Sequence, residues 1–346
     1  MSPVDVHNEW DPLEEIIVGT IRGGRLPTPD RSLRALEYAD LDDLGAAPSG
    51  PFPDHVVEET EAELEMLCDE LSRLGVKVRR PAPHDHSAAF ATPDWQADGF
   101  YDYCPRDGFL AIGDTIIEAP MVLRSRFFEG HSYKEPFQEY FAGGARWISA
   151  PKPRLADEMY DPAAPPGRRL KNLEPAFDAA NVLRFGTDIL YLVSDAGNEM
   201  GCRWLQSVLG DAYRVHACRD LYTGIHLDST LIPLRPGLVL VNPARVTEEN
   251  MPEYLRGWDR IIAPEPFDTG FVGDRPRASV WVGINLLVTA PGQVIVDRRQ
   301  TELIAELSRH GVESIPLQLT HSRSLAGGFH CVTLDVRRSG ELESYR

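Results

Sequence analysis

The stretch Val182-Leu-Arg-Phe-Gly-Thr-Asp-Ile-Leu-Tyr-Leu-Val193 decides the fold, together with the residues that follow it. Two aliphatic and β-branched runs flank a Gly-Thr-Asp turn, which is the pattern of a β-hairpin. A helical pattern then covers residues 199–209, and a short strand pattern covers 213–217. Residues 182–217 therefore predict one unit that consists of a hairpin, a helix and a strand.

The same unit recurs along the chain. Further hairpin patterns cover 109–118, 229–242 and 284–297, and a fifth hairpin would pair 15–19 with 329–337. Helical patterns lie at 56–74, 135–142, 248–258 and 300–310, and the strands after the five helices begin near 76, 145, 213, 259 and 312. Five units with paired ends predict a closed ring, an α/β propeller, in one domain over residues 1–346. The sequence has no G-x-G-x-x-G motif and no phosphate loop, which argues against a nucleotide-binding Rossmann sheet.

Composition narrows the partners and the compartment. The 346 residues include 35 Lys and Arg against 53 Asp and Glu, a formal charge of −18, which argues against binding nucleic acid. No signal-peptide pattern and no apolar run near the ~18 residues of a membrane span is present. Five cysteines without a Cys-x-x-Cys pair argue against a disulfide scaffold and a zinc site. We therefore expect a cytoplasmic protein that acts on small molecules, with no metal, no cofactor and no membrane partner.

One cysteine lies in an unusual setting. Cys331 follows Ser324-Leu-Ala-Gly-Gly-Phe-His330, where two glycines allow a close approach of the backbone. If this segment is a strand, Phe329 and Cys331 share one face and His330 takes the other. Cys331 is a candidate nucleophile, and a small buried hydrophobic residue is the alternative interpretation.

Candidate partners for that cysteine precede several hairpins. His226 and Asp228 are two residues apart, so on a strand they would face the same way, although a hydrogen-bonded edge pair fits equally well. Asp107 and Asp178 precede or open hairpins in the same manner, and an ordinary turn aspartate is the alternative for each. Because these residues occupy comparable places in successive units, the pattern favours a shared site.

These residues belong to motifs that resemble the amidinotransferase family in order and spacing. The motifs are Pro105-Arg-Asp107, Arg124-Ser-Arg-Phe-Phe128, Phe177-Asp-Ala-Ala180, Ile225-His-Leu-Asp228, Asn242-Pro-Ala-Arg245 and Gly327-Gly-Phe-His-Cys331. The resemblance runs from about residue 10 to the end of the chain. It implies the pentein fold, a five-bladed α/β propeller, which agrees with the repeat count, and it implies a homodimer.

The resemblance also implies roles for individual residues. Cys331 would be the nucleophile, His226 the general acid and base, and Asp178 the carboxylate that orients the histidine. The substrate guanidinium would bind to Asp107 and Asp228, and its amino acid carboxylate to Arg245 and Ser279. The implied reaction moves the amidino group of L-arginine to the amine of scyllo-inosamine 4-phosphate, in streptomycin-type antibiotic biosynthesis. It releases ornithine and passes through an amidino-cysteine intermediate.

The acceptor phosphate would need an arginine, and we assign it to Arg126 because the motif of this residue accompanies the Asp107 segment. Three alternatives stay open at this point. The acceptor could be glycine, as in glycine amidinotransferase. The chain could be a hydrolase of the arginine deiminase type, with water as the acceptor. It could also be a propeller without catalytic activity that binds arginine or a protein.

Overall fold

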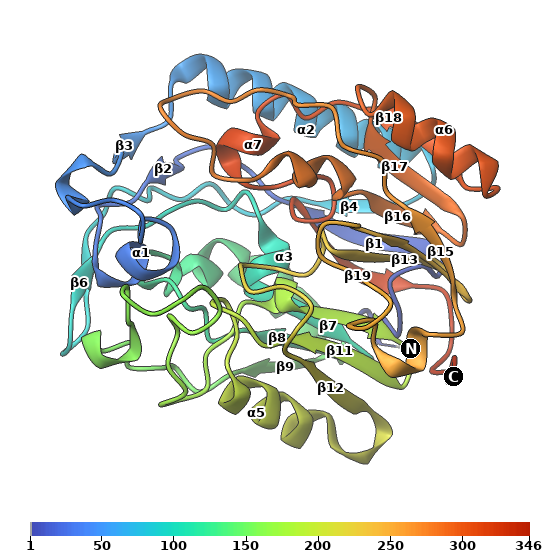
Figure 1. The fold of residues 1–346 in the computed structure, drawn as a ribbon, viewed down its shortest axis with the longest axis horizontal. Coiled ribbons are helices and arrows are strands. Elements are labelled where there is room, and N and C mark those ends of the chain that lie inside the picture. Colours follow the sequence, from blue (N-terminus) through green and yellow to red (C-terminus); the bar gives the residue numbers. More distant parts are fainter. Residues whose placement is uncertain (1) are drawn as a thin grey trace.

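Five three-stranded sheets make up most of the β structure in the computed structural model, which describes residues 2–346 (Figure 1). In each sheet an antiparallel hairpin is followed by a third strand that pairs in parallel with the second one. The sheets, in order of pairing, are β19 (Thr333–Arg338), β1 (Leu13–Val18) and β4 (Lys77–Arg79); β7 (Phe109–Ile112), β8 (Thr115–Glu118) and β9 (Arg146–Ser149); β10 (Val182–Phe185), β11 (Asp188–Leu192) and β12 (Arg214–Cys218); β13 (Leu231–Arg235), β14 (Leu238–Val241) and β15 (Asp259–Ile262); β16 (Leu287–Ala290), β17 (Gln293–Asp297) and β18 (Glu313–Leu317).

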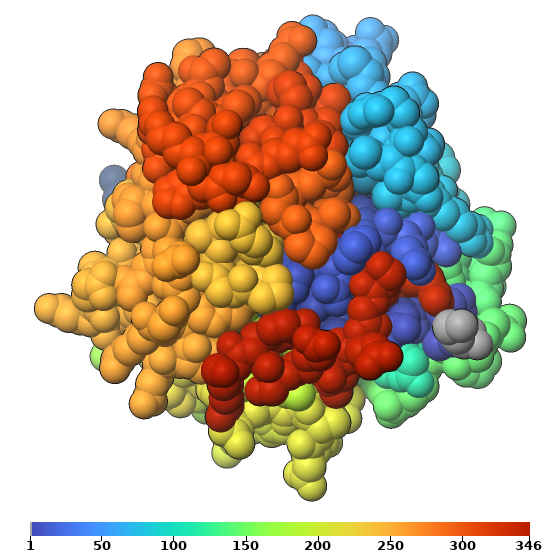
Figure 2. Space-filling model, turned by 90° about the vertical axis from the view of Figure 1, so that its right-hand side faces the viewer, coloured from blue at the N-terminus to red at the C-terminus, as the bar shows by residue number. Residues whose placement is uncertain are grey.

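The two ends of the chain close the ring. β1 pairs with β19 through five residue pairs, from Leu13–Arg338 to Val18–Thr333. Figure 2 looks at the end of the molecule where the chain ends lie: light blue, green, yellow and orange segments follow one another round it, and dark blue and dark red segments from the two ends of the sequence lie side by side. The predicted five-bladed α/β propeller is confirmed, with the predicted helix present in four of its five units, and the predicted starts of the third strands lie within one residue of the observed ones.

Helices connect the second and third strands of four of the units. These helices are α2 (Asp54–Arg73), α4 (Lys134–Ala142), α5 (Glu199–Leu209) and α6 (Thr301–Arg309). In α5 the side chain of Asn198 accepts the N–H of Gly201 and so caps the first turn, and Gly210 follows the last turn with a φ of 65°. Shorter elements lie in the connections: α1 (Arg31–Leu36), α3 (Pro105–Gly108), α7 (Ser322–Leu325), β2 (Arg25–Leu26), β3 (Gly50–Pro51), β5 (Phe90–Ala91) and β6 (Gln96–Ala97).

The helix predicted over 248–258 is wrong. That connection contains one 3₁₀ turn, Glu253–Leu255, and is otherwise irregular. Pro252 has an extended ψ of 133° and restricts the residue before it, so the chain cannot run through this point as a helix. The side chain of Asn250 accepts the N–H of Thr247 and donates to the carbonyl of Arg245, which stabilises a turn instead.

A buried network of ion pairs joins several sheets at the core. Arg184 in β10 is fully buried and donates to both carboxylate oxygens of Glu9 and of Asp335, at 2.7–2.9 Å. It also donates to the carbonyl of Ala111 in β7, at 2.7 Å. Arg106 and Arg338 contact Asp335 as well, so each buried charge has an opposite charge beside it. This network connects the segments on which the candidate site depends. None of the helices within residues 2–346 is both long and apolar enough to cross a membrane.

Candidate active site

The segments that precede the first strands of several units meet at one end of the propeller. Asp107 lies in α3, before β7, and Asp178 lies before β10. His226 and Asp228 lie before β13, and Cys331 lies before β19. All five side chains are buried, and each of them contacts another member of the group. The coincidence of polar residues in successive units therefore reflects a shared location.

The backbone at two of these places is not a strand, contrary to the prediction. His226 lies in a loop with a φ of 63°, a left-handed conformation that is costly for a residue other than glycine. Residues 329–332 form turns, so His330 does not point away from Cys331. Both side chains contact Oδ2 of Asp228, at 2.9 Å from His330 Nδ1 and 3.1 Å from Cys331 Sγ.

Close packing around the two glycines explains this turn. A Cβ atom on Gly327 would lie 2.6 Å from Cys104 Sγ, and one on Gly328 would lie 2.7 Å from atoms of Asn285. Only glycine fits at such distances, and the tight path brings the following thiol into the site. The sequence indicated the close approach correctly but not the conformation that follows from it.

Two asparagines that sequence reasoning missed hold the loops in place. Asn181 precedes β10, and its Oδ1 accepts the N–H of His226 at 3.1 Å. Asn285 precedes β16, and its Oδ1 accepts the N–H groups of His330 and Cys331, both at 3.1 Å. Both asparagines are buried. The signal that could have identified them is their equivalent place, since each stands directly before a hairpin of its unit.

The histidine is held between two carboxylates. His226 Nε2 lies 3.0 Å from Oδ2 of Asp178, and Nδ1 lies 3.5 Å from Oδ1 of Asp107. The other oxygen of Asp178 accepts the N–H of Val122, which fixes the carboxylate. Burial opposes the charge of the imidazolium, but the surrounding carboxylates, with Asp107 first, outweigh it and raise the pKa of His226 to about 9. At neutral pH the imidazole therefore carries a proton that it can donate.

The thiol of Cys331 is surrounded by groups that disfavour its charged form. The contact with the Cys104 thiol, burial and the negative charge of Asp228 raise the pKa of Cys331 well above its usual range. Burial disfavours the charge of Asp228, but the hydrogen bond and charge of His330 outweigh it and lower the pKa of this carboxyl. The Cys331 S–H thus donates to an ionised carboxylate, and positive charge near the sulfur would favour the thiolate.

Arg126 lies beside Asp107, as predicted, but its guanidinium is paired with carboxylates. Its side chain is buried and donates to Oδ2 of Asp107 at 2.7 Å, to both oxygens of Glu129, and to the carbonyl of Cys104. Burial raises the pKa of Glu129 to about 7 against the opposing influence of this arginine. Because carboxylates already surround the guanidinium, its contacts assign Arg126 to positioning Asp107 and not to binding a phosphate.

One oxygen of Asp107 remains available. No hydrogen-bond partner for its buried Oδ1 is found within residues 2–346, and this oxygen faces the imidazole of His226. Burial raises the pKa of the Asp107 carboxyl although His226 and Arg126 lower it. An unpaired carboxylate oxygen in a buried site is costly unless a ligand donates to it.

The two residues expected to hold an amino acid carboxylate, Arg245 and Ser279, differ in burial and in hydrogen bonding. Arg245 is half-buried; its Nη1 donates to the hydroxyls of Ser229 and Thr230, and its guanidinium stacks 3.7 Å above the ring of Tyr222. Ser279 is exposed and precedes the 3₁₀ turn Val280–Ile284. Within residues 2–346 no side-chain hydrogen bond joins Ser279 to the other candidate residues.

Two cavities with shared lining residues lie beside the Asp107, Asp178 and His226 part of the site. The inner cavity is lined by polar and aromatic side chains, among them Phe100, Tyr101, Asp107, Asp178, His226 and Arg277. The outer cavity has a volume of about 440 Å³ and shares Leu36, Glu37, Ile225 and Arg277 with the inner one. In residues 2–346 no group of three His, Cys, Asp or Glu side chains is arranged to hold a metal ion.

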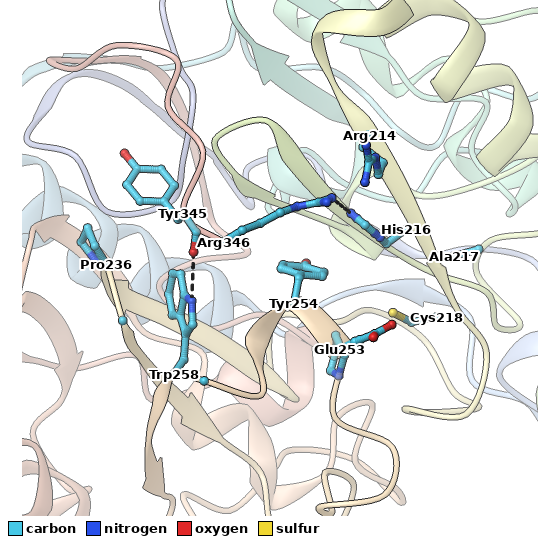
Figure 3. Close-up of a pocket in the computed structure, with 13 residues that line it drawn as sticks. Arg214, His216, Ala217, Cys218, Pro236, Glu253, Tyr254, Trp258, Tyr345 and Arg346 are labelled. Carbon is cyan, nitrogen blue, oxygen red and sulfur yellow. Dashed lines mark hydrogen bonds between the residues drawn. The ribbon is translucent and has the colours of Figure 1, made fainter.

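A wider hollow lies at the other end of the strands (Figure 3). Its lining includes the β13–β14 turn at Gly237, so it is separated from the loops that carry His226 and Cys331. Figure 3 shows Arg346 directed toward His216 there, with Tyr254 and Trp258 nearby. This hollow contains none of the candidate catalytic residues.

The fold and the site together define a class of enzyme. A propeller whose loops collect a thiol, an imidazolium held by a carboxylate, and two further carboxylates can bind a planar cation and attack it. Comparison with known proteins agrees with that class. No family model matches the chain. The chain is 65% identical over 347 residues to inosamine-phosphate amidinotransferase 1 of Streptomyces glaucescens, and the match covers 100% of both chains.

Two further relatives lead to the same family. The chain is 40% identical over 356 residues to L-arginine:L-lysine amidinotransferase of Pseudomonas savastanoi pv. phaseolicola, covering 99% of this chain and 97% of the relative. The solved structure of an inosamine-phosphate amidinotransferase from Streptomyces griseus has a TM-score of 0.99 at 63% identity, covering 100% of this chain and 99% of that one. The chain belongs to the amidinotransferase family and is an enzyme that transfers amidino groups. The predicted family and fold are thus confirmed, and the non-catalytic alternative is wrong.

Proposed function

We propose that the enzyme transfers the amidino group of L-arginine to scyllo-inosamine 4-phosphate and releases ornithine, in streptomycin-type antibiotic biosynthesis. The observation that carries the proposal is the contact of the Cys331 thiol with Asp228, in one site with Asp107 and the His226–Asp178 pair. The names of the relatives support the two substrates, since one is named for inosamine phosphate and another for L-arginine.

The guanidinium of arginine binds between Asp107 and Asp228. A planar cation with five N–H groups suits two carboxylates, and Oδ1 of Asp107 is available to accept from it. The amino acid carboxylate binds to Arg245, with Ser279 as a second contact. The half-buried guanidinium of Arg245 lies close enough to Asp228 for their charges to interact, which suits a substrate that joins the two.

The first half of the reaction forms the covalent intermediate. The incoming guanidinium favours the thiolate, and the thiol proton leaves to solvent. The sulfur of Cys331 then attacks the guanidino carbon and forms a C–S bond. His226 donates its proton to the departing nitrogen of ornithine as the C–N bond breaks. The amidino group remains on the sulfur, and His226 becomes neutral.

The second half returns the enzyme to its starting state. The neutral amine of the acceptor attacks the amidino carbon, and His226 accepts the proton that this nitrogen loses. The C–S bond breaks, Cys331 departs as a thiolate, and it regains a proton from solvent when the product leaves. Asp178 keeps the imidazole in one orientation throughout, since its carboxylate is itself fixed by the N–H of Val122.

Product analysis tests the proposal. The enzyme is incubated with arginine alone and then with inosamine phosphate, glycine or lysine, and ornithine and citrulline are quantified. Intact mass after acid quenching locates any amidino adduct. We expect ornithine, an adduct on Cys331, and transfer to inosamine phosphate in preference to the amino acids. Citrulline formed without an acceptor would contradict the proposal, because it would indicate hydrolysis. The cytoplasmic location and the homodimer stay predictions; light scattering of the purified protein tests the second.

A further inference from the structure

Arg277 is a buried arginine whose guanidinium is partly unpaired. Its side chain is 9% exposed, and Nη2 donates to both oxygens of Glu37, at 2.7 and 2.6 Å. Within residues 2–346 neither Nε nor Nη1 has a hydrogen-bond partner. The guanidinium also lies 4.4 Å from the ring centre of Phe100. Buried N–H groups of a cation are costly when unpaired, so this side chain is suited to an anionic ligand.

The position of Arg277 matches such a role. It lines both the inner cavity, with Asp107 and His226, and the outer cavity, where Arg169 and Arg275 also lie. The N–H groups of Arg277 and Ala278 donate to the carbonyl of Arg323 at 2.9 and 3.1 Å, which fixes the backbone of the segment. An anion at Arg277 would therefore lie where the catalytic site opens outward.

The outer cavity carries less negative charge than the chain as a whole, so an anion is less unfavourable there. Three arginines line it, together with the acidic residues Glu37, Asp195 and Asp274. Asp195 already accepts two backbone N–H groups, from Gly167 and Arg169 at 2.9 and 2.8 Å. In a chain of formal charge −18, a cavity whose three arginines balance its three acidic residues is locally neutral, and it therefore repels an anion less than the rest of the chain does.

We propose that the outer cavity is the acceptor site and that Arg277 binds the phosphate of the acceptor, with Arg169 and Arg275 adding positive charge around it. This inference rests on the proposed function, which supplies a phosphorylated acceptor. The amine and the phosphate of inosamine 4-phosphate lie on opposite sides of the ring. An acceptor whose amine enters the inner cavity beside His226 would have its phosphate on the outer side, toward Arg277, which lines both cavities. The fork of an arginine suits a phosphate.

The test compares two acceptors that differ in the phosphate alone, scyllo-inosamine 4-phosphate and scyllo-inosamine. The variants are Arg277→Gln, Arg277→Lys and, as a matched control, Arg203→Gln on the exposed face of α5. In the Arg277→Gln enzyme we expect the ratio of kcat/KM between the two acceptors to fall about 10–100-fold, the size of a lost charge-assisted contact. In Arg277→Lys we expect a smaller fall in this ratio, and in the control Arg203→Gln we expect no change.

Inorganic phosphate gives a second measurement. It should inhibit the wild-type enzyme competitively with the phosphorylated acceptor and inhibit Arg277→Gln at least about tenfold less. An unchanged ratio in a folded Arg277→Gln enzyme, or an equal loss with both acceptors, would overturn the inference. If Arg277→Gln does not fold, Arg275→Gln tests the same cavity, and the ratio of kcat/KM between the two acceptors should fall about threefold or more. An unchanged ratio in Arg275→Gln would also overturn the inference. Failure of the proposed function is distinct, because the wild-type enzyme would then make no product from the phosphorylated acceptor.

Discussion

The ion-pair network of the core and the catalytic cluster are both buried and both charged, yet they differ in how completely they are paired. In the core, Arg184 donates to four carboxylate oxygens and to the carbonyl of Ala111. In the cluster, Oδ1 of Asp107 has no hydrogen-bond partner in the described residues, and the pKa values of His226 and Cys331 are both raised. Arg184 in the core is fully paired without a ligand, and Asp107 in the cluster is not.

This difference separates stability from function. A fully paired buried charge such as Arg184 contributes to the fold and resists change, because its removal leaves the opposite charges buried and less compensated. A buried carboxylate oxygen without a hydrogen bond, such as Oδ1 of Asp107, costs stability in the free enzyme, and the substrate cation can offset that cost when it binds. Substitutions in the core should therefore act on the unfolding equilibrium, and substitutions in the cluster should act on the reaction.

The largest expected effect is on the nucleophile. Cys331→Ala removes the atom that forms the covalent intermediate, so transfer should fall to the background rate and no amidino adduct should be detected by mass. The matched control is Cys202→Ala, which removes a buried cysteine of α5 outside the cluster. Residual turnover with a new adduct elsewhere would mean that Cys331 is not the nucleophile.

Loss of the acid and base should be the next largest effect. His226→Asn keeps a polar side chain but cannot donate and accept a proton, so kcat should fall on the order of 10²–10⁴-fold while arginine still binds. His216→Asn is a suitable control, since His216 also contacts an aspartate, Asp188 at 2.6 Å, but lies in β12 beside the distant hollow. Full turnover of the His226 variant would contradict its assignment.

The sequence predicted regular structure better than loop conformation. Hairpins and helices recur with clear periodicity, so four helices and the strand starts were correct to within two residues. The helix over 248–258 failed because Pro252 and the side chain of Asn250 outweighed a helical pattern of apolar residues. Local turn chemistry of this kind prevails when no buried face compensates for it.

For the site, the sequence indicated which residues meet but not how they are paired. His226 adopts a left-handed backbone, and His330 shares Asp228 with Cys331; neither feature follows from a strand pattern. Arg126 was placed near Asp107 correctly, but its role depends on Glu129, whose carboxylate takes two of its N–H groups. Pairing of this kind arises from contacts between distant units, and a single sequence does not encode it in any local pattern.

The core network gives the next prediction. Arg184→Met removes one partner of a buried ionic cluster and leaves Glu9 and Asp335 less compensated, so the free energy of unfolding should fall by about 3–5 kcal/mol. Urea denaturation measures it, with Arg203→Met on the exposed face of α5 as control. A change below about 1 kcal/mol would show that the network is weaker than its geometry indicates.

The pH dependence of stability tests the electrostatics of the cluster. Because the folded protein raises the pKa of His226 to about 9, this group stabilises the fold fully below its unfolded pKa of about 6.5 and loses that contribution as the pH rises through 9. Between pH 6.5 and 9 the wild-type enzyme should therefore lose about 3 kcal/mol more than His226→Asn does. Parallel stability curves for the two proteins would contradict the raised pKa.

The smallest effect is expected at Arg126, which is fully paired like Arg184 but contacts a residue of the catalytic cluster. Its guanidinium is fully engaged with carboxylates, as in the core, but one of them, Asp107, belongs to the cluster. Arg126→Lys keeps the charge but loses the planar fork that contacts Asp107, Glu129 and the Cys104 carbonyl together. Asp107 should then be less well oriented, and KM for arginine should rise about tenfold with a smaller change in kcat. The opposite result, a raised KM for the phosphorylated acceptor with that for arginine unchanged, would restore the phosphate contact that the sequence predicted for Arg126.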